Sequence, residues 1–151
     1  ALALLKEDGT AVVFPEALEQ AREDMQQVVR RLAQSKVDEI TQAIEKDIIS
    51  ALEEMLDALQ KAQKDPQRQK SPPGKPKPGQ PQDPPLIDIL AELKMIRAMQ
   101  MRVNLRTERY SKLVQGEQAD KPELIEALQR LAEREAKIHK VTRDLELGRN
   151  Q

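Results

Sequence analysis

The chain of 151 residues has no cysteine and no tryptophan, and apart from a single histidine its only aromatic residues are Phe14 and Tyr110. Without cysteine it cannot form a disulfide framework, a thiolate metal site or a cysteine nucleophile. With so few rings it lacks the flat side chains that commonly anchor ligands, partner proteins and stacked bases. These absences exclude cysteine chemistry and leave few anchors for a ligand pocket or a base-stacking surface.

A long apolar run is also missing. No run approaches the roughly 18 residues needed to cross a bilayer, and residues 1–5 are too short for the apolar region of a signal peptide. We therefore expect no transmembrane span, and both a cytoplasmic and a periplasmic or envelope-associated location stay open. Residues 1–14 are predicted to hold the end of an upstream element and a short extended segment at 11–14.

Charge is abundant but nearly balanced, since 34% of the residues are charged and the net charge is −1. This balance argues against a globally basic nucleic-acid binder. Locally, residues 15–64 hold 7 basic and 11 acidic residues, whereas residues 86–115 hold 6 basic and 3 acidic residues. We expect these two segments to attract each other.

The strongest pattern is the recurrence of apolar residues at steps of three or four over residues 15–64, with no glycine and no proline after Pro15. It predicts one long, nearly straight helix that opens at Pro15, because proline is tolerated in the first turn. The apolar stripe consists of Leu18, Ala21, Met25, Val29, Leu32, Val37, Ile40, Ile44, Ile48, Leu52, Met55, Leu59 and Ala62.

One irregular step interrupts this stripe, since Val37 follows Leu32 by five residues. A kink or break near Ser35 is therefore the alternative to a continuous helix. If the helix breaks there, residues 37–64 would belong to a bundle, and residues 15–34 would project as an arm or fold over one end.

Residues 65–85 contain eight of the ten prolines and no aliphatic residue. Proline removes backbone donors and favours an extended backbone, so we expect a disordered Pro-rich linker. Because such a linker could span the length of a bundle, it leaves open whether the next helix runs parallel or antiparallel to the preceding one.

The second predicted helix, residues 86–115, is apolar on two sides. Two stripes suggest two neighbours, so the helix should either lie centrally or present its second side to another chain. One stripe is Leu86, Ile89, Leu93, Ile96, Val103, Tyr110 and Val114, and the other is Ile87, Ala91, Met95, Ala98, Met101 and Leu105.

The third predicted helix, residues 120–147, should form an antiparallel hairpin with the second. Gly116 is predicted to end the second helix, Asp120 and Glu123 have the spacing of a capping box, and Gly148 is predicted to stop the third helix. The positions of the third helix that we expect to be buried are Leu124, Leu128, Leu131, Glu135 or Ala132, Ile138, Thr142 and Leu145. The predicted fold class is all-α: an elongated antiparallel helical bundle or coiled coil with a long first helix and a Pro-rich linker.

Apolar helix surface in excess of what three helices can hide points to contact with another chain. The candidate protein-interaction residues are Ile87, Met95, Met99, Met101, Leu105, Met25 and Val29. For the methionines, packing inside the bundle is the favoured interpretation, and an adaptable groove for a partner helix is the alternative.

Arg102, Arg106 and Arg109 form a basic stripe on the second helix. Salt bridges to the acidic first segment explain it most simply. Nucleic-acid binding through these three residues is the less favoured alternative, because aromatic residues do not interleave the stripe.

Metal and catalytic signals are weak. Glu135 lies one turn before His139, but no second histidine or Glu-x-x-His step accompanies them, so we expect a surface pair and no metal or other cofactor. The four serines lie on no glycine-rich turn or nucleophile elbow. We expect no enzyme activity and no small-molecule substrate.

Residues 91–104 and 131–144 resemble segments of uncharacterised long-helical, coiled-coil-type bacterial envelope proteins. The resemblance implies no activity and bears only on location. The function that we expect is that of a non-catalytic helical scaffold or adaptor, which acts through helix–helix contacts with a protein partner or in a homo-oligomer.

Overall fold

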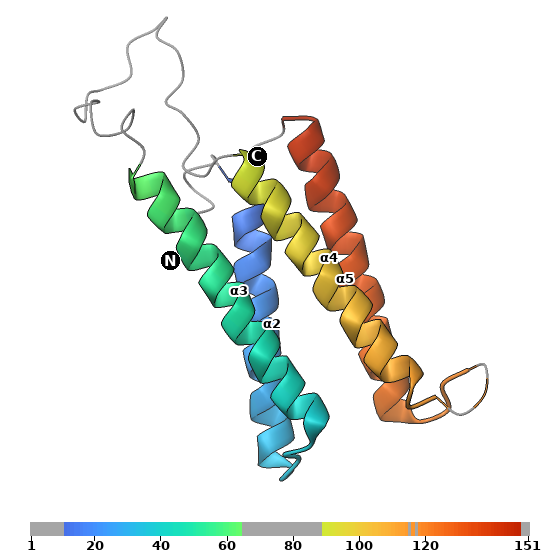
Figure 1. The fold of residues 1–151 in the computed structure, drawn as a ribbon. Coiled ribbons are helices and arrows are strands. Elements are labelled where there is room, and N and C mark those ends of the chain that lie inside the picture. The colour runs from blue at the N-terminus through green and yellow to red at the C-terminus, as the bar shows by residue number, and fades with distance from the viewer. Residues whose placement is uncertain (1–10, 65–88, 115, 117, 149–151) are drawn as a thin grey trace, which may run out of the picture.

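The computed structural model describes residues 11–64, 89–114, 116 and 118–148, and within them the chain is all-helical (Figure 1). Its helices are α2 (Val13–Ala33), α3 (Glu39–Lys64), α4 (Ile89–Ser111) and α5 (Pro122–Glu146). Helices α2 and α4 run in one direction, whereas α3 and α5 run in the other (Figure 1). Each of α2 and α4 contacts all three other helices, so the described residues form a four-helix bundle with antiparallel neighbours along the chain. The predicted linker at 65–85 lies outside the described residues.

The first apolar segment forms two helices where its spacing predicts one. Helix α2 ends at Ala33, Ser35 has a positive φ of 57°, and α3 begins at Glu39. The chain therefore reverses at the irregular five-residue step, and a single straight helix over 15–64 is not formed. A backbone in the left-handed region costs energy for serine, so the turn must be stabilised by its surroundings.

Three side chains stabilise this turn. Asp38 stands directly before α3 and its Oδ1 accepts a hydrogen bond from the Thr41 backbone N–H at 3.0 Å, as an N-cap residue does. Arg31 at the end of α2 donates to both Asp38 oxygens at 2.8 Å and to the Thr41 hydroxyl at 2.8 Å. Because these bonds fold α2 back onto α3, α2 is a full member of the bundle, and the predicted arm or end cover is wrong.

Helix α2 also begins earlier than predicted. It starts at Val13 rather than Pro15, so the second half of the expected extended segment at 11–14 is helical. A residue that is distant in the sequence stabilises this earlier start. The Glu92 carboxylate on α4 accepts hydrogen bonds from the backbone N–H groups of Val12 and Val13 at 2.7 and 2.9 Å. This carboxylate satisfies donors that a helix start leaves without an acceptor.

The predicted α4–α5 hairpin is formed, but its caps differ from the prediction. Helix α4 ends at Ser111, before Gly116, and α5 begins at Pro122 with no side-chain cap bond from its N-cap residue Lys121. The expected capping box is absent, because the Glu123 side chain binds Lys36 in the α2–α3 turn. Gly148, with φ of 63°, follows the end of α5 as predicted.

The core lies between the four helices and is mainly aliphatic. Its buried apolar residues include Val13, Phe14, Ala17, Ala21, Ile44, Ala51, Met55, Met95, Met99, Val103, Tyr110, Leu124, Leu131, Ile138 and Val141. Five residues of the predicted first stripe are instead exposed: Met25, Val29, Leu32, Val37 and Leu52. On α4 the two predicted stripes reduce to one buried face, and Leu93, Met101 and Leu105 are exposed.

Candidate interaction surface and buried ionic network

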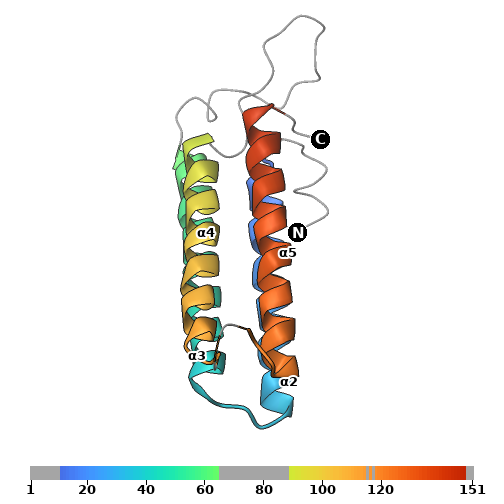
Figure 2. The same cartoon turned by 90° about the vertical axis from the view of Figure 1, so that its right-hand side faces the viewer.

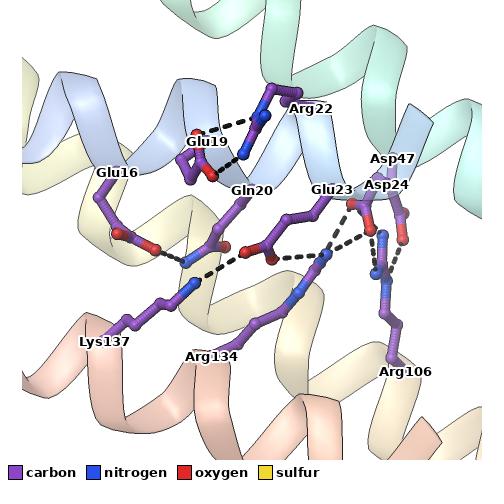
Figure 3. A network of polar contacts seen from close by, with 10 residues as sticks. All are labelled: Glu16, Glu19, Gln20, Arg22, Glu23, Asp24, Asp47, Arg106, Arg134 and Lys137. Carbon is purple, nitrogen blue, oxygen red and sulfur yellow. Dashed lines mark hydrogen bonds and ion pairs between the residues drawn. The ribbon is translucent and has the colours of Figure 1, made fainter. Parts of the chain in front are cut away.

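Four charged side chains meet inside the bundle, one from each helix (Figure 3). They are Asp24 from α2, Asp47 from α3, Arg106 from α4 and Arg134 from α5, and each residue is buried. We call this set the ionic layer. Two aspartates and two arginines make its formal charge neutral, which is the condition under which buried charges are tolerated.

Asp24 is the centre of the ionic layer because both arginines bind it. Arg106 donates from Nη1 and Nη2 to the two Asp24 oxygens at 2.8 and 2.7 Å, and Arg134 donates to the same two oxygens. Arg106 also donates from Nε to Asp47 at 2.8 Å. Each Asp24 oxygen therefore accepts two charge-assisted hydrogen bonds, and the fork shape of the guanidinium group makes both contacts bidentate.

Burial and pairing oppose each other in this layer. Burial disfavours the ionised Asp24 carboxylate, but the hydrogen bonds and charges of Arg106 and Arg134 outweigh it, so the pKa of Asp24 lies below its usual value. Burial also disfavours the Arg106 guanidinium, and its bonds to Asp24 and Asp47 outweigh that effect and raise its pKa. Asp24 and Arg106 are thus both charged at neutral pH.

A partly exposed rim extends the ionic layer towards solvent (Figure 3). Glu23 on α2 lies 3.7 Å from Arg134 and accepts a hydrogen bond from Lys137 at 2.8 Å. On the other side, Arg109 on α4 lies 3.6 Å from Asp47. These contacts tie α2 to α5 and α3 to α4, so the charges connect each helix of one hairpin to the other hairpin.

All three arginines of the predicted basic stripe form ion pairs with acidic residues of α2 or α3. Arg106 lies in the ionic layer, Arg102 binds Glu54 on α3 at 3.0 and 3.1 Å, and Arg109 pairs with Asp47. The expectation that the stripe forms salt bridges with the acidic first segment is confirmed. Of the three arginines only Arg109 keeps more than a third of its side chain exposed, which leaves little of the stripe for phosphate groups.

The predicted protein-interaction residues fall into three groups. Met95 and Met99 are buried in the core, as the packing interpretation for the methionines requires, so their side chains are not available at the surface. The exposed members are Met25, Val29, Met101 and Leu105. Ile87 lies outside the described residues.

The exposed members on α2 belong to a larger apolar surface that also includes α3. On α2, Met25, Val29 and Leu32 are exposed at steps of four and three residues, so they lie along one side of the helix. On α3, Ile49, Leu52 and Leu56 are exposed at steps of three and four. Because α2 and α3 pack against each other along the bundle, we call these six side chains the α2–α3 face.

The predicted surface pair on α5 has an ordinary environment. Glu135 accepts a hydrogen bond from Gln100 on α4 at 2.8 Å, and His139 is exposed. No group of three or more His, Cys, Asp or Glu side chains with the geometry to hold a metal ion occurs among the described residues. Likewise, no helix in the described part of the chain is long and apolar enough to cross a membrane.

Sequence reasoning missed the inward position of the charges, although a signal was present. Arg106 lies between Val103 and Tyr110, and Arg134 lies between Leu131 and Ile138, in both cases three residues after one core residue and four before the next. A charge at that spacing occupies the buried face of a helix. Reading charged residues together with the apolar stripe would have identified both arginines.

Comparison with known proteins finds no family model that matches the chain, and no curated protein or solved structure that is significantly similar to it. The resemblance of residues 91–104 and 131–144 to long-helical envelope proteins stays a prediction.

Proposed function

We propose that this protein is a non-catalytic helical scaffold or adaptor that acts through helix–helix contacts, and that its first partner is a second copy of itself. The observation that carries the proposal is the α2–α3 face. Six large apolar side chains are exposed along two neighbouring helices, and Val29 alone keeps 66% of its surface exposed. Large apolar side chains that are exposed on neighbouring helices often mark interaction sites.

A second copy is the occupant that this face fits best, because the face can pack against itself. A two-fold axis that lies in the α2–α3 face would pack the face of one copy on the same face of the other. Such packing would bury the apolar side chains of both copies.

The test is the mass of the full chain in solution over a range of concentrations. Sedimentation velocity should show a concentration-dependent dimer. Leu56→Glu on the α2–α3 face should shift the chain to a monomer, because it would place a carboxylate inside an apolar contact. Leu90→Glu on α4 is the matched control, since Leu56 and Leu90 are 55% and 56% exposed and only Leu56 belongs to the face.

Circular dichroism of both variants would establish that they keep the helical fold. A monomeric wild-type chain at high concentration would overturn the proposal. Loss of the dimer in the Leu90→Glu variant alone, or in neither variant, would move the contact away from the α2–α3 face and equally overturn it.

A further inference from the structure

A cavity of about 360 Å³ lies at the end of the bundle where α2 turns into α3. We call it the end cavity. The end of α4 and the start of α5 lie at this same end of the bundle (Figure 1). All four helices or their adjoining turns contribute to its wall, and its volume falls within the range of small-molecule sites. Its apolar lining is Ile40, Tyr110, Leu113, Leu124 and Ala127.

The charges at the end cavity leave a positive surplus. Five cations and three acids line it, and three of the cations are paired: Arg31 with Asp38, Lys36 with Glu123, and Arg130 with Glu126. The side chains of the remaining two, Arg30 and Lys121, form no ion pair or hydrogen bond with any described residue. An anion at this end would meet two cations that need not leave another partner.

Tyr110 supplies an independent indication of a ligand. It is only 5% exposed and it lines the end cavity, yet within the described part of the chain its hydroxyl has no hydrogen-bond partner. A buried tyrosine hydroxyl usually has such a partner, because an unsatisfied donor in the interior costs free energy. A ligand oxygen in the cavity would supply the missing acceptor.

We infer that the end cavity binds a small organic anion, a carboxylate or sulfonate with an apolar body, through Arg30, Lys121 and the Tyr110 hydroxyl. The apolar body would pack on Ile40, Leu124 and the tyrosine ring. The anionic group would accept a hydrogen bond from Tyr110 and lie near the two unpaired cations. Such a molecule would be a ligand rather than a substrate, and the inference does not depend on the α2–α3 face.

The chain offers a specific readout, because Tyr110 is its only tyrosine and it has no tryptophan. Titration of the full chain with octanoate should change the tyrosine fluorescence in a saturable way. Octanol, which has the same apolar chain without the charge, should bind at least tenfold more weakly. If octanol and octanoate bind equally well, the cavity does not recognise the negative charge and the inference is wrong. The absence of a saturable change in tyrosine fluorescence up to millimolar octanoate would also overturn it.

Three variants assign the polar contacts, with calorimetry as the measure of affinity. Arg30→Gln and Lys121→Gln should each weaken octanoate binding several-fold, and the double variant more than tenfold. Tyr110→Phe, which removes only the hydroxyl, should also weaken it. Lys94→Gln on the exposed surface of α4, away from the end cavity, is the matched control and should leave the affinity unchanged.

Thermal melts would show whether each variant keeps its fold. If the Arg30→Gln/Lys121→Gln double variant is folded and binds octanoate as tightly as the wild type, the assigned site is wrong. Equal weakening by Lys94→Gln would mean that the anion responds only to overall charge, which also contradicts the inference.

Discussion

The interior of the bundle has two regions that are built differently. One region is the apolar core, which contains the fully buried Met99 together with Met55, Met95 and Ile138. Contacts between apolar side chains have no preferred direction, so several arrangements of these side chains would be similarly favourable. In the ionic layer, by contrast, each contact is a directed hydrogen bond between particular atoms of Asp24, Arg106 and their partners. Figure 2 shows the two hairpins, α2–α3 and α4–α5, that both regions hold together.

The difference separates stability from specificity. Aliphatic cores tolerate many substitutions of similar volume, so the packing around Met99 does not by itself determine which helices are neighbours or at what height. The ionic layer is complete only when one residue from each helix lies at the same level. We infer that it sets the register of the two hairpins, at the energetic cost that burial of charge carries.

The largest expected effect comes from removing the centre of the ionic layer. Asp24→Ala would leave Arg106 and Arg134 buried without their shared partner, which should lower the free energy of unfolding by about 3–5 kcal/mol. Urea unfolding followed by circular dichroism at pH 7 would measure it. Glu23→Ala, one residue away at the partly exposed rim, is the control and should lose less than about 1 kcal/mol. If the two variants lose similar amounts, the distinction between layer and rim is wrong.

A smaller loss is expected in the apolar region. Met99→Ala should lower the free energy of unfolding by about 3 kcal/mol, because it removes buried surface and leaves a cavity. Met99→Leu keeps nearly the same volume and should lose less than about 1.5 kcal/mol. The same urea experiment applies. A Met99→Leu variant as unstable as Met99→Ala would show that this region is as specific in its contacts as the ionic layer.

Acid should affect the two regions differently, because only one of them contains Asp24. The pKa of Asp24 is lowered in the folded chain, so its contribution is present above the unfolded value near 3.8 and is lost as the pH falls through the folded value. A single such group gives a slope of at most about 1.4 kcal/mol per pH unit. The stability of the wild type should therefore fall more steeply below pH 4 than that of Asp24→Asn, whereas Met99→Ala should keep the wild-type slope. Parallel curves for wild type and Asp24→Asn would contradict the assignment.

Sequence patterns predict the helices well because a helix face repeats locally. The step of three and four residues places Leu124, Leu131 and Ile138 on the buried side of α5, and the five-residue step after Leu32 lies where the chain turns. Gly148 likewise ends α5 through its own backbone. Each of these features depends on residues that are close together in the chain.

The remaining features depend on partners that are distant in the chain. The bond between Glu92 and the start of α2 joins residues 79 and 80 positions apart, and Arg134 meets Asp24 across 110 positions. The predicted capping box at Glu123 fails for the same reason, since Lys36 of another hairpin takes its carboxylate. Spacing within one helix can mark Arg106 and Arg134 as buried, but it does not record which distant residue each one binds, so the pairing of Arg134 with Asp24 could not be predicted.

The smallest expected effect concerns Glu92, a buried carboxylate without a basic partner among the described residues. Burial raises its pKa, and the hydrogen bonds from the backbone of Val13 and Val12 only partly offset the shift. The folded chain therefore holds the Glu92 proton more tightly than the unfolded chain does. The contribution of this group to stability is fully present below the pKa of the unfolded chain, and it is lost as the pH rises through the pKa of the folded chain.

Glu92→Gln keeps an acceptor for the two N–H groups and should change the free energy of unfolding at pH 7 by less than about 1 kcal/mol. It should also remove this pH dependence, whose sign is opposite to that of Asp24, and urea unfolding between pH 4 and 7 would measure both. A Glu92→Gln variant that unfolds α2 at pH 7 would show instead that the charge itself is required, as it is in the ionic layer.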